Sequence, residues 1–127
     1  MTQEDKQLLL KDLCARLNTN LVCSIYRIDD QGVGYRNEIL YGYCNIEGWD
    51  EFYFGEDCGI SIDYVSKIKP YLFPLSSITK KTLEELSAYI DIKNAYIAVE
   101  FFHSHHIDYR GLIEKGLALD ATGLNIY

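Results

Sequence analysis

The stretch from Phe101 to Asp108 (FFHSHHID) holds three histidines and one carboxylate, the densest group of reactive side chains in the chain. On a helix, His103 and His106 are three residues apart and share a face, whereas His105 is turned about 200° from His103. Such a pair could bind a metal ion or act as a general base beside Asp108. A polar helix end, with imidazole rings at the negative end of the helix dipole, is the simpler interpretation and the one we favour.

Other patterns typical of catalysis are weak in this sequence. A helical H-x-x-H pair needs a remote third ligand for zinc, and no other residues have metal-ligand spacing. Ser104, His106 and Asp108 are sequence neighbours, whereas a catalytic triad is defined by converging geometry. We therefore expect no metal and no cofactor, and an enzyme centred on His103 and His106 is the alternative to a binding protein.

Arg110 lies in the segment Asp108-Tyr109-Arg110-Gly111, and its guanidinium could hold a carboxylate or phosphate of a ligand. An internal partner, Asp108 or Glu114, is the interpretation that we favour. Such an ion pair would fix a glycine-containing C-terminal segment on the rest of the protein.

The four cysteines, Cys14, Cys23, Cys44 and Cys58, contain no C-x-x-C pair. The N-terminal sequence MTQEDKQLLLKDL is charged and lacks the uninterrupted apolar region of a signal peptide. We therefore expect reduced cysteines that fill core positions in a cytoplasmic protein. No apolar run approaches the length of a membrane span.

Charge is distributed unevenly along the 127 residues, which carry 12 Lys and Arg against 19 Asp and Glu. Residues 37–66 contain seven acids and no Lys or Arg, so this window accounts for the whole net charge of −7. The acidic balance argues against direct binding to nucleic acid. It is compatible with two interpretations: a solvated face that maintains solubility, or a surface complementary to a basic protein partner.

Aromatic side chains accompany the acids in this window and would give rigid contact area. The predicted partner-binding residues are Tyr41, Tyr43, Glu47, Trp49, Asp50, Glu51, Tyr53, Glu56 and Asp57. A special form of this hypothesis is mimicry of DNA, with carboxylates in place of phosphates. A self-associating domain, in which the aromatic sheet face forms a homodimer, is a third hypothesis.

The N-terminal third of the chain predicts a helix followed by strands. Thr2 and Asp5 fit a capping box for a helix over residues 3–17. Its predicted buried stripe is Leu10, Leu13, Cys14 and Leu17, with Lys11, Asp12 and Arg16 on the opposite face. Strands are predicted at residues 21–28, 38–45 and 50–54, with a turn at Glu47-Gly48. In the second strand, Ile39, Tyr41 and Tyr43 are expected on one face and Leu40, Gly42 and Cys44 on the other.

The remainder predicts one undecided segment, a connector and two helices. Residues 60–68 could be strand or helix, so a fourth strand at 59–64 is an open alternative. Pro70 and Pro74 predict an extended connector, followed by helices over 80–90 and 95–106 and a largely irregular tail. Together these elements predict one α+β domain over 1–127, with a small antiparallel sheet of three or four strands and helices mainly on one face.

Three blocks of sequence carry a resemblance: LLLKDLCARL at 8–17, IKPYLFPLSSIT at 68–79 and HIDYRGLIEKGLAL at 106–119. They resemble small uncharacterised proteins common in gut-bacterial genomes and their prophages. In that group an arginine often stands where Phe73 stands here, and a phenylalanine where Ile107 stands. The resemblance implies a cytoplasmic accessory protein of a mobile element, with no activity, ligand or catalytic residue to carry over.

Overall fold

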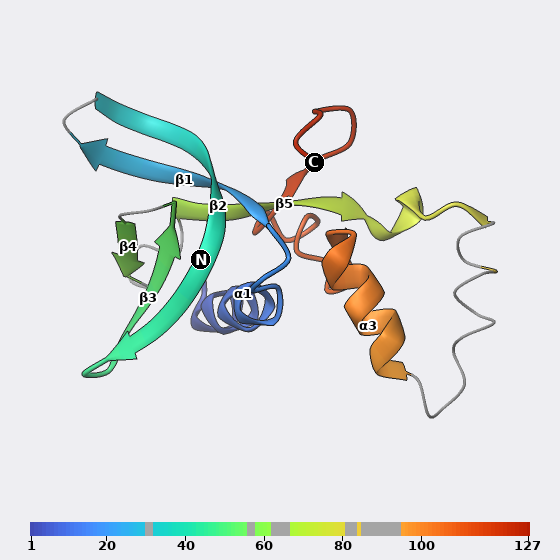
Figure 1. The fold of residues 1–127 in the computed structure, drawn as a ribbon, viewed down its shortest axis with the longest axis horizontal. Helices are drawn as coiled ribbons and strands as arrows, with labels where there is room; N and C mark the ends of the chain where they lie inside the picture. The colour runs from blue at the N-terminus through green and yellow to red at the C-terminus, as the bar shows by residue number, and fades with distance from the viewer. Residues whose placement is uncertain (30–31, 56–57, 62–66, 81–83, 85–94) are drawn as a thin grey trace.

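The computed structural model describes residues 1–29, 32–55, 58–61, 67–80, 84 and 95–127. It confirms the α+β class (Figure 1). The elements in chain order are helix α1 (Gln3–Ala15), strands β1 (Val22–Asp29), β2 (Gly32–Ile46), β3 (Trp49–Phe54), β4 (Cys58–Ser61) and β5 (Ile68–Pro74), the 3-10 turn η2 (Leu75–Ser77), helix α3 (Ala95–Ser104), and strands β6 (Ile107–Asp108) and β7 (Leu119–Asp120).

The sheet is larger than expected and it is mixed. Its order is β4-β3-β2-β1-β5-β6, and β7 also pairs with β5. The pairs from β4 to β5 are antiparallel, whereas β6 and β7 run parallel to β5. The expectation of an antiparallel sheet of three or four strands was therefore too small, because the segment predicted as a connector is strand β5.

Two prolines led to this error, since proline interrupts a regular helix and favours an extended chain, which indicated a connector. Pro70 nevertheless pairs with Cys23 of β1, and Pro74 pairs with Asp108 of β6. The side chains of β5 alternate as a half-buried strand requires, with Ile68, Pro70 and Leu72 buried. The alternation of buried and half-buried side chains predicts strand β5 better than its proline content does.

Helix α1 begins and ends for reasons visible in the sequence. The hydroxyl of Thr2 accepts from the amide of Asp5 at 3.1 Å, and the Asp5 carboxylate accepts from the amide of Thr2 at 3.2 Å, which confirms the capping box. Asn18 and Asn20 have φ values of 67° and 57°, and asparagine tolerates this left-handed conformation after a helix.

The predicted polar face of α1 was wrong in part. Asp12 and Arg16 are fully buried beside Leu9 and Leu13, and these four residues follow one another at i, i+3, i+4 and i+7. Only Lys11 of the predicted polar residues is exposed. The buried stripe is thus rotated by about one residue from the expected one, because it includes an ion pair that a hydrophobicity pattern does not recognise.

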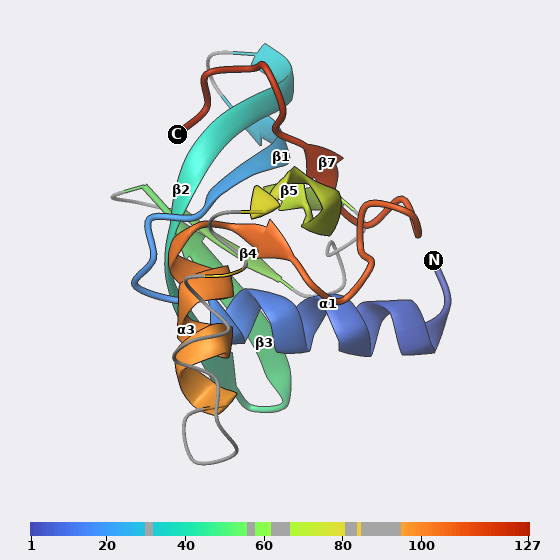
Figure 2. The same cartoon turned by 90° about the vertical axis from the view of Figure 1, so that its right-hand side faces the viewer.

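Helix α1 lies across one face of the sheet, and α3 lies close to the C-terminal end of α1 (Figure 2). The core forms between α1 and the sheet and is closed by the segment after β6. Its buried members are Leu9, Leu13, Leu21, Cys23, Ile25, Leu40, Phe52, Phe54, Ile68, Leu72, Leu112, Leu117 and Ala118. Complete burial of each of the larger side chains contributes about 1.5–3 kcal/mol before the cost of ordering the chain.

Several boundaries differ from the predictions. Strand β2 begins at Gly32, six residues before the predicted start, and the residues that close the β1–β2 hairpin lie outside the described ranges. Residues 60–61 belong to β4, whereas 62–66 and most of the predicted helix 80–90 lie outside the described residues. The tail, expected to be largely irregular, supplies the short strands β6 and β7.

Candidate functional site

The β2–β3 hairpin carries most of the predicted partner-binding residues. Its two strands are joined by Glu47 and Gly48, whose φ values of 51° and 87° are those of a two-residue hairpin turn. The pairs run from Ile46 opposite Trp49 back to Leu40 opposite Phe54. The sequence therefore predicted this turn and this strand pair correctly.

A bulge at Tyr41 changes which side chains face the core. The register shifts between Leu40 and Gly42, so one extra residue of β2 stands against β3. Leu40 and Tyr43 consequently both pack on the core face, where Tyr43 lies against Phe52 with ring centroids 5.2 Å apart. The prediction that Tyr43 shares a face with Ile39 was wrong, because strict alternation ends at the bulge.

The outer face of the hairpin, away from the core, carries Ile46, Trp49, Glu51 and Tyr53. The side chain of Trp49 is 56% exposed and that of Ile46 is 49% exposed. The hydroxyl of Tyr53 donates to Glu51 at 3.1 Å, and this bond raises the pKa of Tyr53. Since Glu51 accepts a hydrogen bond from the phenol, its carboxylate is held in one orientation on the same strand face as the exposed indole of Trp49. We call these four residues the hairpin outer face.

On the opposite side of the hairpin, Asp50 forms a separate polar group. Its carboxylate accepts hydrogen bonds from the hydroxyl of Tyr43 and from the amide of Asn45, the latter at 2.9 Å. Both bonds lower the pKa of Asp50, and the bond to Asp50 raises the pKa of Tyr43. Adjacent strand residues point to opposite faces, so Asp50 and Glu51 do not form one surface.

The structure thus divides the predicted partner-binding set. Trp49, Glu51 and Tyr53 share the hairpin outer face, while Tyr43 and Asp50 lie on the other side. Tyr41 is 58% exposed at the bulge, and Glu47 lies in the turn. Glu56 and Asp57 lie outside the described residues.

Glu38, another acid of the charged window, forms an ion pair within the chain. Glu38 of β2 accepts from Arg27 of β1 at 2.6 Å, across the β1–β2 pair. The acids of residues 37–66 therefore do not all lie on a solvated surface without partners.

The histidines at the end of α3 point to different partners. Nε2 of His103 lies 2.7 Å from the hydroxyl of Tyr109, and burial together with the Arg16 guanidinium lowers the pKa of His103. Nε2 of the neutral ring can therefore accept a hydrogen bond from the Tyr109 hydroxyl. His105 stacks on Phe101 with centroids 4.0 Å apart, and its Nδ1 lies 3.1 Å from the Phe101 carbonyl oxygen, as in the helix-end interpretation.

His106 has a different environment from the other two histidines. It is only 7% exposed, and its ring stacks on Tyr127 with centroids 3.7 Å apart. Burial, followed by the charges of Arg16 and His105, lowers its pKa to about 4. Among the described residues, no three His, Cys, Asp or Glu side chains form a group able to hold a metal ion.

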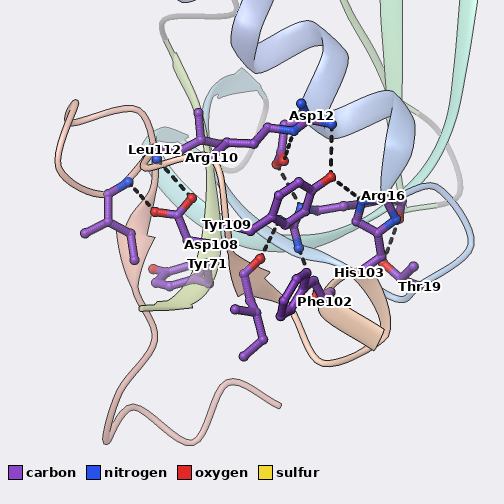
Figure 3. A network of polar contacts seen from close by, with 12 residues as sticks. Asp12, Arg16, Thr19, Tyr71, Phe102, His103, Asp108, Tyr109, Arg110 and Leu112 are labelled. Carbon is purple, nitrogen blue, oxygen red and sulfur yellow. Dashed lines mark hydrogen bonds and ion pairs between the residues drawn. The ribbon is translucent and has the colours of Figure 1, made fainter. Parts of the chain in front are cut away.

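Asp108 is buried and both of its carboxylate oxygens accept from backbone amides. Oδ1 lies 2.9 Å from the amide nitrogen of Leu112, and Oδ2 lies 2.9 Å from that of Ile113 (Figure 3). In this arrangement Asp108 fixes the turn that begins at Leu112. Its oxygens are thereby engaged in structure, at a position that we considered for catalysis.

Arg110 has an internal partner, as favoured, but the partner is not one of the two predicted acids. Its Nε donates to Asp12 at 3.1 Å, and its Nη2 donates to the hydroxyl of Tyr109 at 3.0 Å (Figure 3). Asp12 also accepts from Nε of Arg16 at 2.9 Å, so one buried carboxylate lies between two guanidinium groups. The sequence hint for Asp12 and Arg16 was their i, i+4 spacing.

The structure describes the thiols of three of the four cysteines. Cys14, Cys23 and Cys44 are free, and burial raises the pKa of Cys14 and of Cys23. This agrees with the expectation of unpaired cysteines at these three positions.

Comparisons with protein-family models, curated proteins and solved structures found no match to this chain. In the described part of the chain, no helix has the length and apolar character needed to cross a membrane. Inference about function therefore depends on the side chains themselves.

Proposed function

We propose that this chain is a protein-binding module that uses the hairpin outer face, and that its partner presents a basic segment. The observation that carries the proposal is the position of Trp49, a half-exposed indole beside the hydrogen-bonded pair of Glu51 and Tyr53. Exposed aromatic side chains are enriched at protein interfaces, and carboxylates around them complement a basic partner surface.

The chemistry of this face suits lysine or arginine. A cation above an exposed aromatic ring gains about 0.5–1 kcal/mol, and an exposed ion pair gains about 0.2–1 kcal/mol. The absence of Lys and Arg from residues 37–66 means that no basic residue of this window competes for Glu51. Two or three such contacts, with burial of Trp49 and Ile46, support a weak and salt-sensitive complex.

The resemblance described above supports an accessory role, in which a protein from a mobile element modulates a host protein. Self-association of the aromatic face and an enzyme centred on His103 and His106 are the competing hypotheses. The exposed Trp49 fits self-association as well, whereas the carboxylates beside it favour a basic partner over a second copy of this acidic chain.

Trp49 is also the probe for the test, because it is the only tryptophan in the chain. Its fluorescence should change on addition of hexa-arginine and stay constant with hexa-glutamate. The double variant Glu47→Asn/Glu51→Gln removes two charges from the hairpin, and asparagine suits the left-handed conformation at position 47. We expect it to weaken peptide binding at least fivefold.

The matched control is Glu100→Gln/Glu114→Gln, which removes two exposed acids from other parts of the protein. Its affinity for hexa-arginine should remain within twofold of wild type. Equal weakening by the two double variants would mean that only net charge matters and would overturn the proposal. A Trp49 signal that depends on protein concentration without peptide would instead assign this face to a second copy.

A further inference from the structure

The hydroxyl of Tyr127 occupies a position in the sheet between β1 and β5. The register of these strands, with Cys23 opposite Pro70 and Ile25 opposite Ile68, places Val22 opposite Tyr71 at the next position. Instead of bonding directly, this pair is bridged by the phenol. The Val22 amide donates to the Tyr127 oxygen at 3.0 Å, and the Tyr127 hydroxyl donates to the Tyr71 carbonyl oxygen at 2.7 Å.

The bridge satisfies both capacities of a hydroxyl group. A phenol has one proton to donate and an oxygen that accepts, and the gap offers one N–H donor and a carbonyl acceptor. The Val22 carbonyl oxygen, at 3.3 Å, is a second acceptor within reach. A side chain without a hydroxyl could fill this space but would leave backbone groups of Val22 and Tyr71 without this partner.

The ring of Tyr127 packs against the rings of His106 and Phe73. Its ring stacks on His106 with centroids 3.7 Å apart and planes inclined by 13°, and the Phe73 ring lies 5.9 Å away. The other side of Tyr127 is open, since the residue is 44% exposed. Residues 122–125, which lead to Tyr127, are exposed as well.

The imidazole of His106, against which Tyr127 stacks, has an unpartnered nitrogen. Its Nδ1 is buried and has no hydrogen-bond partner, although the residue is 7% exposed. A buried polar atom without a partner costs free energy and needs an explanation. Stacking on an aromatic ring explains this unpartnered atom. The stacked Tyr127 ring fixes the plane of the imidazole in an orientation in which Nδ1 has no hydrogen-bond partner.

We propose that Val22, Tyr71, Phe73 and His106 form a binding slot for a tyrosyl side chain, filled in the structure by Tyr127 and available to a tyrosine of a partner chain when Tyr127 leaves. We call this group the tyrosyl slot. It is independent of the hairpin outer face and would survive failure of the function proposed above. Its ligand class is a phenol on a peptide, recognised by stacking and by the hydrogen-bonding backbone of the sheet.

The test opens the slot and fills it again with a small phenol. In the variant Tyr127→Ala, p-cresol should bind at millimolar concentration and shift the backbone amide resonance of Val22. Toluene, which has the same ring and methyl group but no hydroxyl, should bind at least fivefold more weakly. The variant Tyr127→Phe keeps the ring in the slot and should show no p-cresol shift at Val22.

The peptide form of the ligand tests availability to a partner. N-acetyl-tyrosinamide should bind Tyr127→Ala at least tenfold more tightly than wild type, because Tyr127 competes in the intact chain. Equal binding of toluene and p-cresol, or equal p-cresol shifts in the Ala and Phe variants, would overturn the proposal. If Tyr127→Ala does not fold, wild type at high N-acetyl-tyrosinamide concentration must still shift Val22, and its failure to do so would overturn the proposal too.

Discussion

Nη2 of Arg16, at the end of α1, donates to the carbonyl oxygen of Ile107 at 2.6 Å, just beyond the end of α3 (Figure 3). Nη1 of the same guanidinium reaches the Phe102 carbonyl oxygen at 3.4 Å. Phe102 lies in the last turn of α3, where carbonyl groups lack intrahelical partners and carry partial negative charge, so a cation stabilises them. One fully buried side chain thus joins the two helices, and Asp12 balances its charge.

Replacement of Arg16 by methionine should therefore destabilise the fold strongly. The change leaves Asp12 buried opposite Arg110 alone and removes the donors to Phe102 and Ile107. Loss of one partner of a buried ion pair typically costs about 3–5 kcal/mol. Urea unfolding followed by circular dichroism would measure the loss. The double variant Asp12→Leu/Arg16→Met should recover part of it, and a single variant that loses less than about 1 kcal/mol would contradict this role.

Asp108→Asn should test whether this carboxylate is structural. The amide side chain keeps one acceptor oxygen, so one of the bonds from Leu112 and Ile113 is lost along with the negative charge. We expect a loss of about 1–3 kcal/mol in the free energy of unfolding. Unchanged stability would mean that the turn forms without Asp108, and the carboxylate would again be open to another role.

Stability should fall as the pH is lowered from about 6.5 towards 4. The pKa of His106 is about 4 in the folded chain, against an ordinary value of 6.5. Between these values the unfolded chain binds a proton that the folded chain does not, so acid favours unfolding. The expected loss is on the order of 2 kcal/mol.

The variant His106→Phe keeps a ring for stacking on Tyr127 and removes this titration. Its free energy of unfolding should depend less on pH between 6.5 and 4.5. Some dependence should remain, because the pKa of His103 is lowered as well. Identical pH profiles for the variant and wild type would show that His106 is not protected from protonation by the fold.

The sequence predicted those parts of the fold that local patterns determine. The capping box of Thr2 and Asp5, the Glu47-Gly48 turn and the strand at residues 50–54 are all local signals, and each was confirmed. The face change in β2 was not predictable, because the bulge at Tyr41 depends on the pairing with β3. Strand β5 was missed since its partners come from residues far away in the chain.

In the candidate functional site, too, local patterns were predictable and long-range contacts were not. Trp49, Glu51 and Tyr53 were named from composition. Alternation within β3 already separates Asp50 from them, whereas the face of Tyr43 required the register of β2 against β3. Arg16 bonds to Ile107, which is 91 residues away, and Tyr127 bonds to Tyr71, which is 56 residues away. No sequence pattern indicates contacts between residues so far apart in the chain.

A chemical-shift titration of the 15N-labelled wild-type chain with a basic peptide tests most directly whether the hairpin outer face is the binding surface. Addition of hexa-arginine should shift the indole N–H of Trp49 and the amides of Glu51 and Tyr53, with smaller changes along α3. The shifts should diminish as salt is raised towards physiological strength and above it. Shifts spread evenly over all exposed acids, or confined to α3 and the tail, would contradict the assignment of the hairpin outer face as the binding surface.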